Sequence, residues 1–180
     1  MEQPAETLTN GPVELRRWQV ADLDVLAQLI EASLDHLRPW MPWADAHDRR
    51  ATADYLDRVQ EGWATGRAFD YAITTDGEVV GSCGLMRRIG PGGMEIGYWI
   101  SPGRTGRGLV TMSVAALVRA AFALPDVTHV EIHHDEANKA SGAVPQRLGF
   151  TVVSRAVDPA RGAAPAESGV SVVHRLRRGQ

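Results

Sequence analysis

Three consecutive segments joined by short turns constrain the fold of this chain more than any other feature of the sequence. In the first segment Phe69, Tyr71 and Ile73 recur at every second position, which is the spacing of a strand. The pair Asp76-Gly77 follows it, and a glycine-rich turn follows the second segment. Strands joined by turns this short pair antiparallel. The three segments are residues 69–75, 79–86 and 94–100.

The apolar period changes on both sides of these strands to the three-to-four spacing of helices. Helices are predicted at about residues 23–30, 48–65, 110–124 and 138–148. Further strands are predicted over residues 13–18, 127–134, 150–157 and 169–176. The fold class is therefore α/β of the α+β kind, with about seven strands in one mixed, largely antiparallel sheet and four flanking helices.

The length and composition favour one domain without a membrane or nucleic-acid partner. The 180 residues contain no linker, so residues 13–177 are predicted to form a single domain after a flexible lead-in over residues 1–12. The formal net charge of −3 argues against a mainly electrostatic grip on nucleic acid or lipid. The lone Cys83 can form no internal disulfide, and no apolar run approaches the roughly 20 residues of a membrane helix, so a cytoplasmic protein is expected.

The bend that follows the third strand is the segment most suited to bind a ligand. It runs over residues 101–111, from a strand end to a helix start, and holds Gly106 and Gly108. Glycines let the backbone approach a ligand closely, and the free N–H groups of a helix start bind phosphate. Arg104 and Arg107 add positive charge. A plain glycine-rich turn is the alternative; a P-loop is disfavoured because Leu109 follows Gly108 where that motif needs Lys.

Three separated motifs resemble those of the GNAT N-acetyltransferases. Gly106-Arg107-Gly108 behind the strand over residues 95–102 looks like the acetyl-coenzyme A motif of that superfamily. The run Asn138-Lys139-Ala140-Ser141 before Leu148-Gly149-Phe150 is similar to its second signature. Together with Leu37-Arg38-Pro39-Trp40-Met41-Pro42-Trp43, the pattern resembles the RimJ/RimL group, which acetylates the N-termini of ribosomal proteins, over roughly residues 13–175.

The resemblance implies a GNAT fold, a splay between the fourth and fifth strands, and acetyl-coenzyme A as co-substrate. The pyrophosphate would lie on the N–H groups of residues 106–111, and the pantetheine arm would pair with backbone near Trp99 and Ile100. The residues expected to bind the cofactor are Trp99, Ile100, Arg104, Thr105, Gly106, Arg107, Gly108, Leu109, Val110, Thr111, Asn138 and Ser141. The chain departs from the superfamily at Thr105, at Val110 and at Pro145, which stands where many members carry a proton-donating Tyr.

The same resemblance assigns catalytic and acceptor-binding residues. Glu95 would be the general base that takes a proton from the acceptor amine, directly or through a water, and it would also bind the amine. Ser141 would hydrogen-bond the departing thiolate, and Trp40 and Trp43 would border the acceptor groove. Each has a structural alternative: a solvated carboxylate for Glu95, helix capping for Ser141 and Asn138, and core packing for the tryptophans.

The acceptor is left open by the sequence. A protein N-terminal α-amine leads, a small amine such as a polyamine, an aminoglycoside or an amino-acid derivative is the alternative, and a non-catalytic acyl-coenzyme A binding module is a third hypothesis. A homodimer is among the expected states. His133 and His134 are neighbours on one strand and point to opposite faces, so no metal site is predicted.

Overall fold

One eight-stranded sheet organises the structure, a computed structural model that describes residues 2–159 and 164–179. The strand order is β1-β2-β3-β4-β5-β6-β8-β7, and every neighbouring pair is antiparallel except β5 and β6. The strands are β1 Thr7–Asn10, β2 Val13–Arg17, β3 Ala68–Thr75, β4 Glu78–Met86, β5 Gly93–Ile100, β6 His129–Asp135, β7 Thr151–Val157 and β8 Val170–Arg177. The predicted fold class is thus confirmed, including the meander β3-β4-β5.

Two elements were not predicted from the sequence. Strand β1 lies within the segment expected to be a lead-in, so the sheet has eight strands and not about seven. Its sequence Thr-Leu-Thr-Asn shows little apolar alternation, and Gly11, with a φ of 60°, turns it back onto β2. The other addition is the single-turn helix α2, Leu34–Leu37, in an expected loop.

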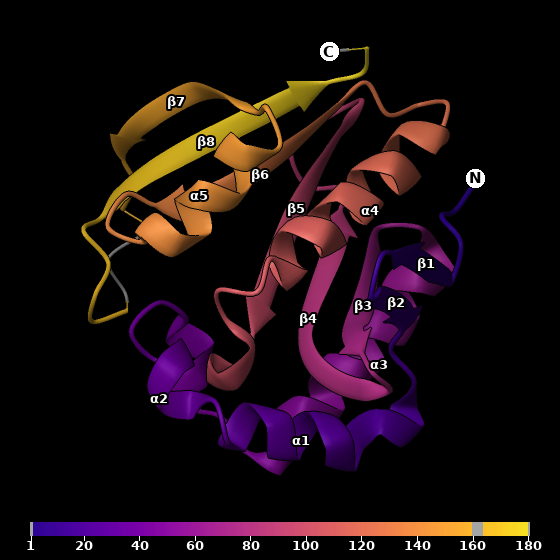
Figure 1. Cartoon of the computed structure of the whole chain (residues 1–180), viewed down its shortest axis with the longest axis vertical. Coiled ribbons are helices and arrows are strands. Elements are labelled where there is room, and N and C mark those ends of the chain that lie inside the picture. Colours follow the sequence, from indigo (N-terminus) through magenta and orange to yellow (C-terminus); the bar gives the residue numbers. More distant parts are fainter. Residues whose placement is uncertain (1, 160–163, 180) are drawn as a thin grey trace.

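The four longer helices cover both faces of the sheet, as Figure 1 shows. Helix α4 packs on one face, whereas α1 and α3 lie on the opposite face and α5 lies beside β6. Helix α3 begins where the Asp48 carboxylate accepts a hydrogen bond from the Ala51 N–H, and it ends at Gly66 with a φ of 70°. The helices are α1 Leu23–Glu31, α3 Arg49–Thr65, α4 Leu109–Ala123 and α5 Lys139–Arg147.

Large aromatic side chains anchor α3 to the sheet. Trp63 is buried edge-on against Phe69 and Tyr71, with ring centroids 5.0 Å and 5.3 Å away. Trp18 is also fully buried, and its indole N–H donates to the Ser82 hydroxyl at 3.0 Å. This core fixes the positions of β3 and β4, which form the floor of the candidate site.

The sheet opens between β5 and β6. The two strands pair only where Gly93–Glu95 face His129–Glu131, and beyond Glu95 they spread apart, as the V between β5 and β6 in Figure 1 shows. Over the rest of its length β5 keeps its hydrogen bonds to β4 on the other side. The splay that the resemblance implied between the fourth and fifth predicted strands is therefore present. Beyond Glu95, the backbone edge of β5 that faces the splay forms no pairs with β6.

Candidate active site

The glycine-rich bend presents a row of backbone donors at the start of α4. Gly106 and Gly108 have φ values of 72° and 74°, which side-chain-bearing residues rarely adopt, and nothing lies within 4 Å of a Cβ added at either. In the part of the chain that the structure describes, the N–H groups of residues 106–111 have no hydrogen-bond acceptor. They line a cavity of about 650 Å³, so the bend can hold an anion such as a diphosphate.

The two arginines of the bend differ in their surroundings. The Arg104 guanidinium forms an ion pair with the Glu78 carboxylate at the end of the β3–β4 turn. Arg107 has no ion-pair partner among the described residues, and it lines the same cavity. The Thr105 hydroxyl donates to the Pro102 carbonyl at 3.0 Å. Arg107 is therefore the freer of the two positive charges that the sequence assigned to the cofactor.

Ser141 and Asn138 lie across the splay from β5, at the start of α5. The Asn138 side-chain oxygen caps this helix by accepting from the Ser141 N–H at 3.1 Å, so the capping role considered for Asn138 is present. The Tyr98 hydroxyl donates to the Ser141 carbonyl at 2.8 Å, and the Ser141 hydroxyl lies 3.4 Å from the Tyr98 oxygen. Burial raises the pKa of Tyr98 to about 12, against a smaller opposing effect of its hydrogen bond with Ser141, so the phenol keeps its proton.

Pro145 explains why this carbonyl is free to accept from Tyr98. In an α-helix the N–H of residue 145 would bond to the carbonyl of Ser141, four residues earlier, and proline has no N–H. The helix nevertheless continues to Arg147. Tyr98 thus supplies the donor that Pro145 lacks, and the bond joins β5 to α5.

A second cavity of about 530 Å³ adjoins the first where β5 and β6 separate. Its aromatic wall includes Trp40 and Trp43, with the Trp43 ring 6.4 Å from that of Trp99. The residues that line both cavities are Trp40, Met41, Tyr98, Trp99, Asn138 and Ser141. A ligand on the bend could therefore reach through the splay to a second ligand beyond it.

Glu95 lies in this second cavity, paired with an arginine that the sequence reading had not singled out. Its residue is 8% exposed, and its two carboxylate oxygens accept from the Arg88 guanidinium at 2.8 Å and 2.5 Å. The alternative of a fully solvated carboxylate is wrong for this position. Glu95, Gly97 and Trp99 share one face of β5 and all three line this cavity, and the end of the Met86 side chain lies over Gly97.

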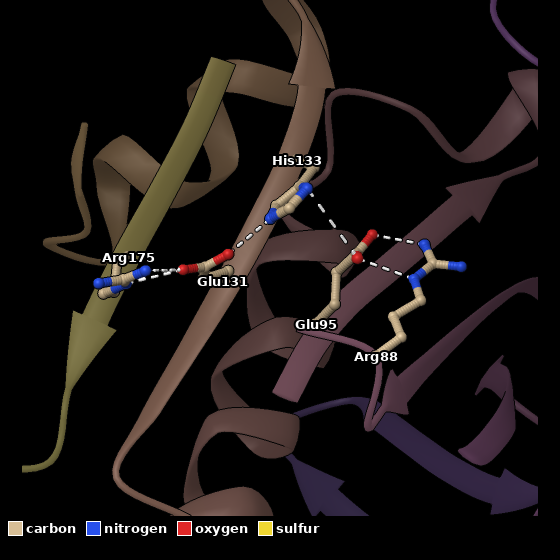
Figure 2. A network of polar contacts seen from close by, with 5 residues as sticks. All are labelled: Arg88, Glu95, Glu131, His133 and Arg175. Carbon is tan, nitrogen blue, oxygen red and sulfur yellow. Dashed lines mark hydrogen bonds and ion pairs between the residues drawn. The ribbon is translucent and has the colours of Figure 1, made fainter. Parts of the chain in front are cut away.

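Figure 2 shows that Glu95 belongs to a chain of polar contacts across the splay, in which His133 lies between two carboxylates that are each paired with an arginine. His133 Nε2 lies 2.6 Å from a Glu131 oxygen, and His133 Nδ1 lies 4.0 Å from Glu95 Oε2. The other Glu131 oxygen accepts from Arg175 Nε on β8 at 2.7 Å. Burial opposes ionisation of Glu131, but its hydrogen bonds with His133 and Arg175 outweigh burial and lower its pKa.

A buried carboxyl forms the far end of the same cavity. The Tyr55 hydroxyl lies 3.4 Å from Asp70 and 3.4 Å from the Ser82 hydroxyl. Burial raises the pKa of Asp70 to about 6, although the Tyr55 hydrogen bond and the Arg88 charge oppose this. An Asp70 oxygen lies 2.7 Å from where a Cβ of Gly84 would stand, so only glycine at 84 leaves this carboxyl its place.

Sequence reasoning missed Arg88, Asp70, Tyr98 and the pair formed by Glu131 and His133. One signal was available: residues 131 and 133 alternate on β6 and share a face, as residues two apart on a strand do. No three His, Cys, Asp or Glu side chains gather as a metal site would require within residues 2–159 and 164–179. Nor does any helix of that part have the length and apolar content to cross a bilayer.

Comparison with known proteins identifies the family. The profile of the acetyltransferase (GNAT) domain matches residues 13–151. The chain belongs to the GNAT acetyltransferases. In this GNAT enzyme the match spans the bend, both strands of the splay and helix α5, whereas β1 and β8 lie outside the matched residues. The resemblance stated from the three motifs is confirmed.

Individual relatives of this GNAT enzyme share its length and fold. YdaF of Bacillus subtilis (strain 168), provisionally named a ribosomal N-acetyltransferase, is 27% identical over 155 residues, or 83% of each chain. RimL, the ribosomal L7/L12 α-N-protein acetyltransferase solved with coenzyme A, superposes with a TM-score of 0.87 at 21% identity, covering 96% of this chain and 98% of RimL. The microcin C7 self-immunity acetyltransferase MccE, solved with acetyl-CoA and AMP, superposes with a TM-score of 0.85 at 17% identity, and the superposition covers 93% of each chain.

Proposed function

We propose that this protein transfers the acetyl group of acetyl-coenzyme A to the α-amine at the N-terminus of a protein. The observation that carries the proposal is the run of N–H groups without acceptors at residues 106–111, which lines a cavity adjoining the one that contains Glu95. A diphosphate is the ligand that such a helix start binds best. The names of RimL and YdaF, both assigned to ribosomal N-acetylation, favour a protein N-terminus as acceptor.

The residues described above suit the co-substrate on one side of the splay. Gly106 and Gly108 let the backbone approach the diphosphate, and the unpaired edge of β5 near Trp99 and Ile100 can pair with the pantetheine arm. A backbone N–H on this edge can stabilise the oxyanion of the tetrahedral intermediate. Ser141 lies where the two cavities meet, so its hydroxyl can hydrogen-bond the departing sulfur.

On the other side of the splay, Glu95 is the proposed general base. An α-amine has a pKa of about 8 and is mostly protonated at neutral pH, so it must lose a proton before it attacks. The Glu95 carboxylate can attract the ammonium and take this proton directly or through a water. Arg88 fixes both oxygens of Glu95 and so holds the carboxylate in one orientation.

Calorimetry and a thiol-release assay test the proposal in sequence. Coenzyme A should bind to the protein, and acetyl-coenzyme A should be consumed when the N-terminal peptide of ribosomal protein L7/L12 is added. The same peptide with an acetylated N-terminus is the matched control and should give no thiol. Turnover of spermidine but of no peptide would instead support the small-amine alternative, and coenzyme A binding without any turnover would support a binding module.

Substituting Glu95→Gln tests the residue assigned as base. We expect kcat to fall about 100-fold, the usual contribution of a general base, with the Kd of coenzyme A unchanged. Glu14→Gln, at an exposed position of β2, is the control and should behave as the wild type. An unchanged rate in Glu95→Gln would remove this carboxylate from the mechanism.

A further inference from the structure

The charges around His133 balance when its ring is neutral. Arg88 is paired with Glu95, and Arg175 is paired with Glu131, so two positive charges offset two negative ones. His133 lies between the two carboxylates, as Figure 2 shows. A proton added to this ring would therefore be placed between two negative groups, in a cluster that carries no other excess charge.

The hydrogen bond to Glu131 determines which nitrogen of His133 is basic. A carboxylate can only accept, so the nitrogen 2.6 Å from Glu131, Nε2, carries the hydrogen of the neutral ring. The lone pair is then on Nδ1, which points toward Glu95. Arg175 donates to the other oxygen of Glu131, so the carboxylate that orients the His133 ring is itself held in place.

The space between His133 and Glu95 fits an amine. Nδ1 and Oε2 are 4.0 Å apart, which is too long for a hydrogen bond between them. An ammonium nitrogen can lie at a normal distance of about 2.9 Å from both atoms; the two hydrogen bonds then diverge by roughly 90°, about 20° less than the angle between its N–H bonds, and such bending is tolerated by hydrogen bonds. Both residues line the second cavity, and the His133 side chain is 23% exposed.

We propose that His133 is a second catalytic residue, which takes and holds the proton that the acceptor ammonium loses while Glu95 binds that ammonium. The inference rests on the proposed function. It assigns to Glu95 the task of binding and orienting the amine, and to His133 the task of keeping the proton during acetyl transfer. An imidazole, with a usual pKa of about 6.5, retains a proton at neutral pH far better than a carboxyl group with a usual pKa of about 4.

One proton moves from the ammonium to Nδ1 of His133 along the hydrogen bond between them, while the Glu95 carboxylate accepts a second hydrogen bond from the same nitrogen. The freed electron pair of nitrogen forms a C–N bond at the thioester carbon, and the C–S bond breaks. A second proton leaves nitrogen and converts the thiolate to a thiol through the Ser141 hydroxyl or water, while the third stays on the amide. His133 then releases its proton to solvent.

Other ionisable groups share the cavity and define the controls. Those that line it beyond the chain in Figure 2 are His47, Arg58, Asp70, His134, Asp135 and Glu167. His129 lies on the same face of β6 as His133, four residues earlier, and lines neither cavity. It is the matched control, since it is a histidine of the same strand without access to the amine.

The test compares His133→Gln with His129→Gln in the thiol-release assay with the L7/L12 N-terminal peptide. We expect kcat to fall about 100-fold in His133→Gln, with peptide KM and the Kd of coenzyme A within threefold of the wild type. His129→Gln should match the wild type in every measure. A His133→Gln enzyme with a wild-type rate would overturn the inference while leaving the proposed function intact.

Nuclear magnetic resonance gives a second measurement that does not depend on turnover. The ring ¹³Cε1 signal of His133, assigned by its absence in His133→Gln, should move when the free-amine peptide binds with coenzyme A, and remain in place with the N-acetylated peptide. A signal that stays in place when the free amine binds would count against His133 whatever the turnover assay gives. Absence of both coenzyme A binding and peptide turnover in the wild type would instead contradict the proposed function itself.

Discussion

The two sides of the splay are built from different parts of the polypeptide. The side at the start of α4 presents backbone N–H groups from six consecutive residues, 106–111. The opposite side presents side chains from β3, β5, β6 and β8, which are far apart in the sequence. A backbone site depends on φ and ψ and so constrains a few glycines, whereas a side-chain site can change its ligand by single substitutions. The cofactor of such an enzyme is therefore easier to infer than its acceptor.

The largest expected effect concerns the buried carboxyl of Asp70. Its pKa is raised from 3.8 to about 6, so the folded protein holds this proton more tightly than the unfolded chain. The carboxyl thus imposes no penalty below about pH 4, and the free energy of unfolding falls by up to about 3 kcal/mol as the pH rises through 6. The asparagine of Asp70→Asn cannot ionise. The free energy of unfolding of this variant, measured in urea, should therefore rise relative to that of the wild type by roughly 1.4 kcal/mol between pH 5 and pH 8. A constant difference would mean that Asp70 is solvated.

The next effect tests the backbone side. Gly108→Val places a branched side chain at a φ of 74° and beside the N–H groups of the helix start. We expect coenzyme A to bind about 100-fold more weakly by calorimetry, which corresponds to roughly 2.7 kcal/mol. Gly103→Val is the control, because Gly103 has no positive φ, has open space around a Cβ and lines neither cavity. Equal affinities for the two variants would break the contrast between the two sides.

A smaller effect tests the connection between the sides. Tyr98→Phe removes the donor to the Ser141 carbonyl and should lower the free energy of unfolding by about 1–2 kcal/mol. Pro145→Ala restores the helical N–H that the carbonyl lacks. Tyr98→Phe should therefore lower the free energy of unfolding by less in the Pro145→Ala variant than in the wild type, as measured by a double-mutant cycle in urea. Additive effects would show that the carbonyl does not depend on Tyr98.

The smallest effect concerns Arg104 and Glu78, whose side chains are 27% and 65% exposed. An exposed ion pair contributes about 0–1 kcal/mol, so Glu78→Gln should change the free energy of unfolding by less than about 1 kcal/mol. It should also release Arg104 toward the bend and strengthen coenzyme A binding by about twofold, measured at low salt. A weaker affinity would mean that the ion pair holds Arg104 in its binding position.

The sequence predicted the elements whose signals are local. The turn Asp76-Gly77, the helix stop at Gly66 and the glycines of the bend were all readable, because positive φ angles restrict the residue type. Strand β1 was missed because Leu8 is the single apolar residue on its inward face, and one residue in a four-residue edge strand shows no alternation in the sequence. The residue assignments at the cofactor bend depended on this local chemistry together with the family resemblance.

The acceptor side could be read only in part, because its contacts join distant segments. Arg175 meets Glu131 only because the strand order places β6 and β8 side by side. Arg88 lies in the turn between β4 and β5, seven residues before Glu95, and no sequence signal showed that its side chain turns back onto this carboxylate. Asp70 appeared as one polar member of an alternating strand, and its burial follows from Tyr55 on α3 covering it. Side-chain chemistry created by sheet topology is therefore the portion of the site that the sequence did not disclose.

The hydrogen bond from the Tyr98 hydroxyl to the Ser141 carbonyl joins β5 to α5 across the opening between them. Pro145 has no N–H to donate to the Ser141 carbonyl. If β5 and α5 moved apart, the bond to Tyr98 would break and this carbonyl would lose its donor. This bond therefore sets the distance between β5 and α5, and we do not expect the two elements to open as a hinge. A thioester that lies between β5 and α5 would therefore meet an opening that exists before it binds.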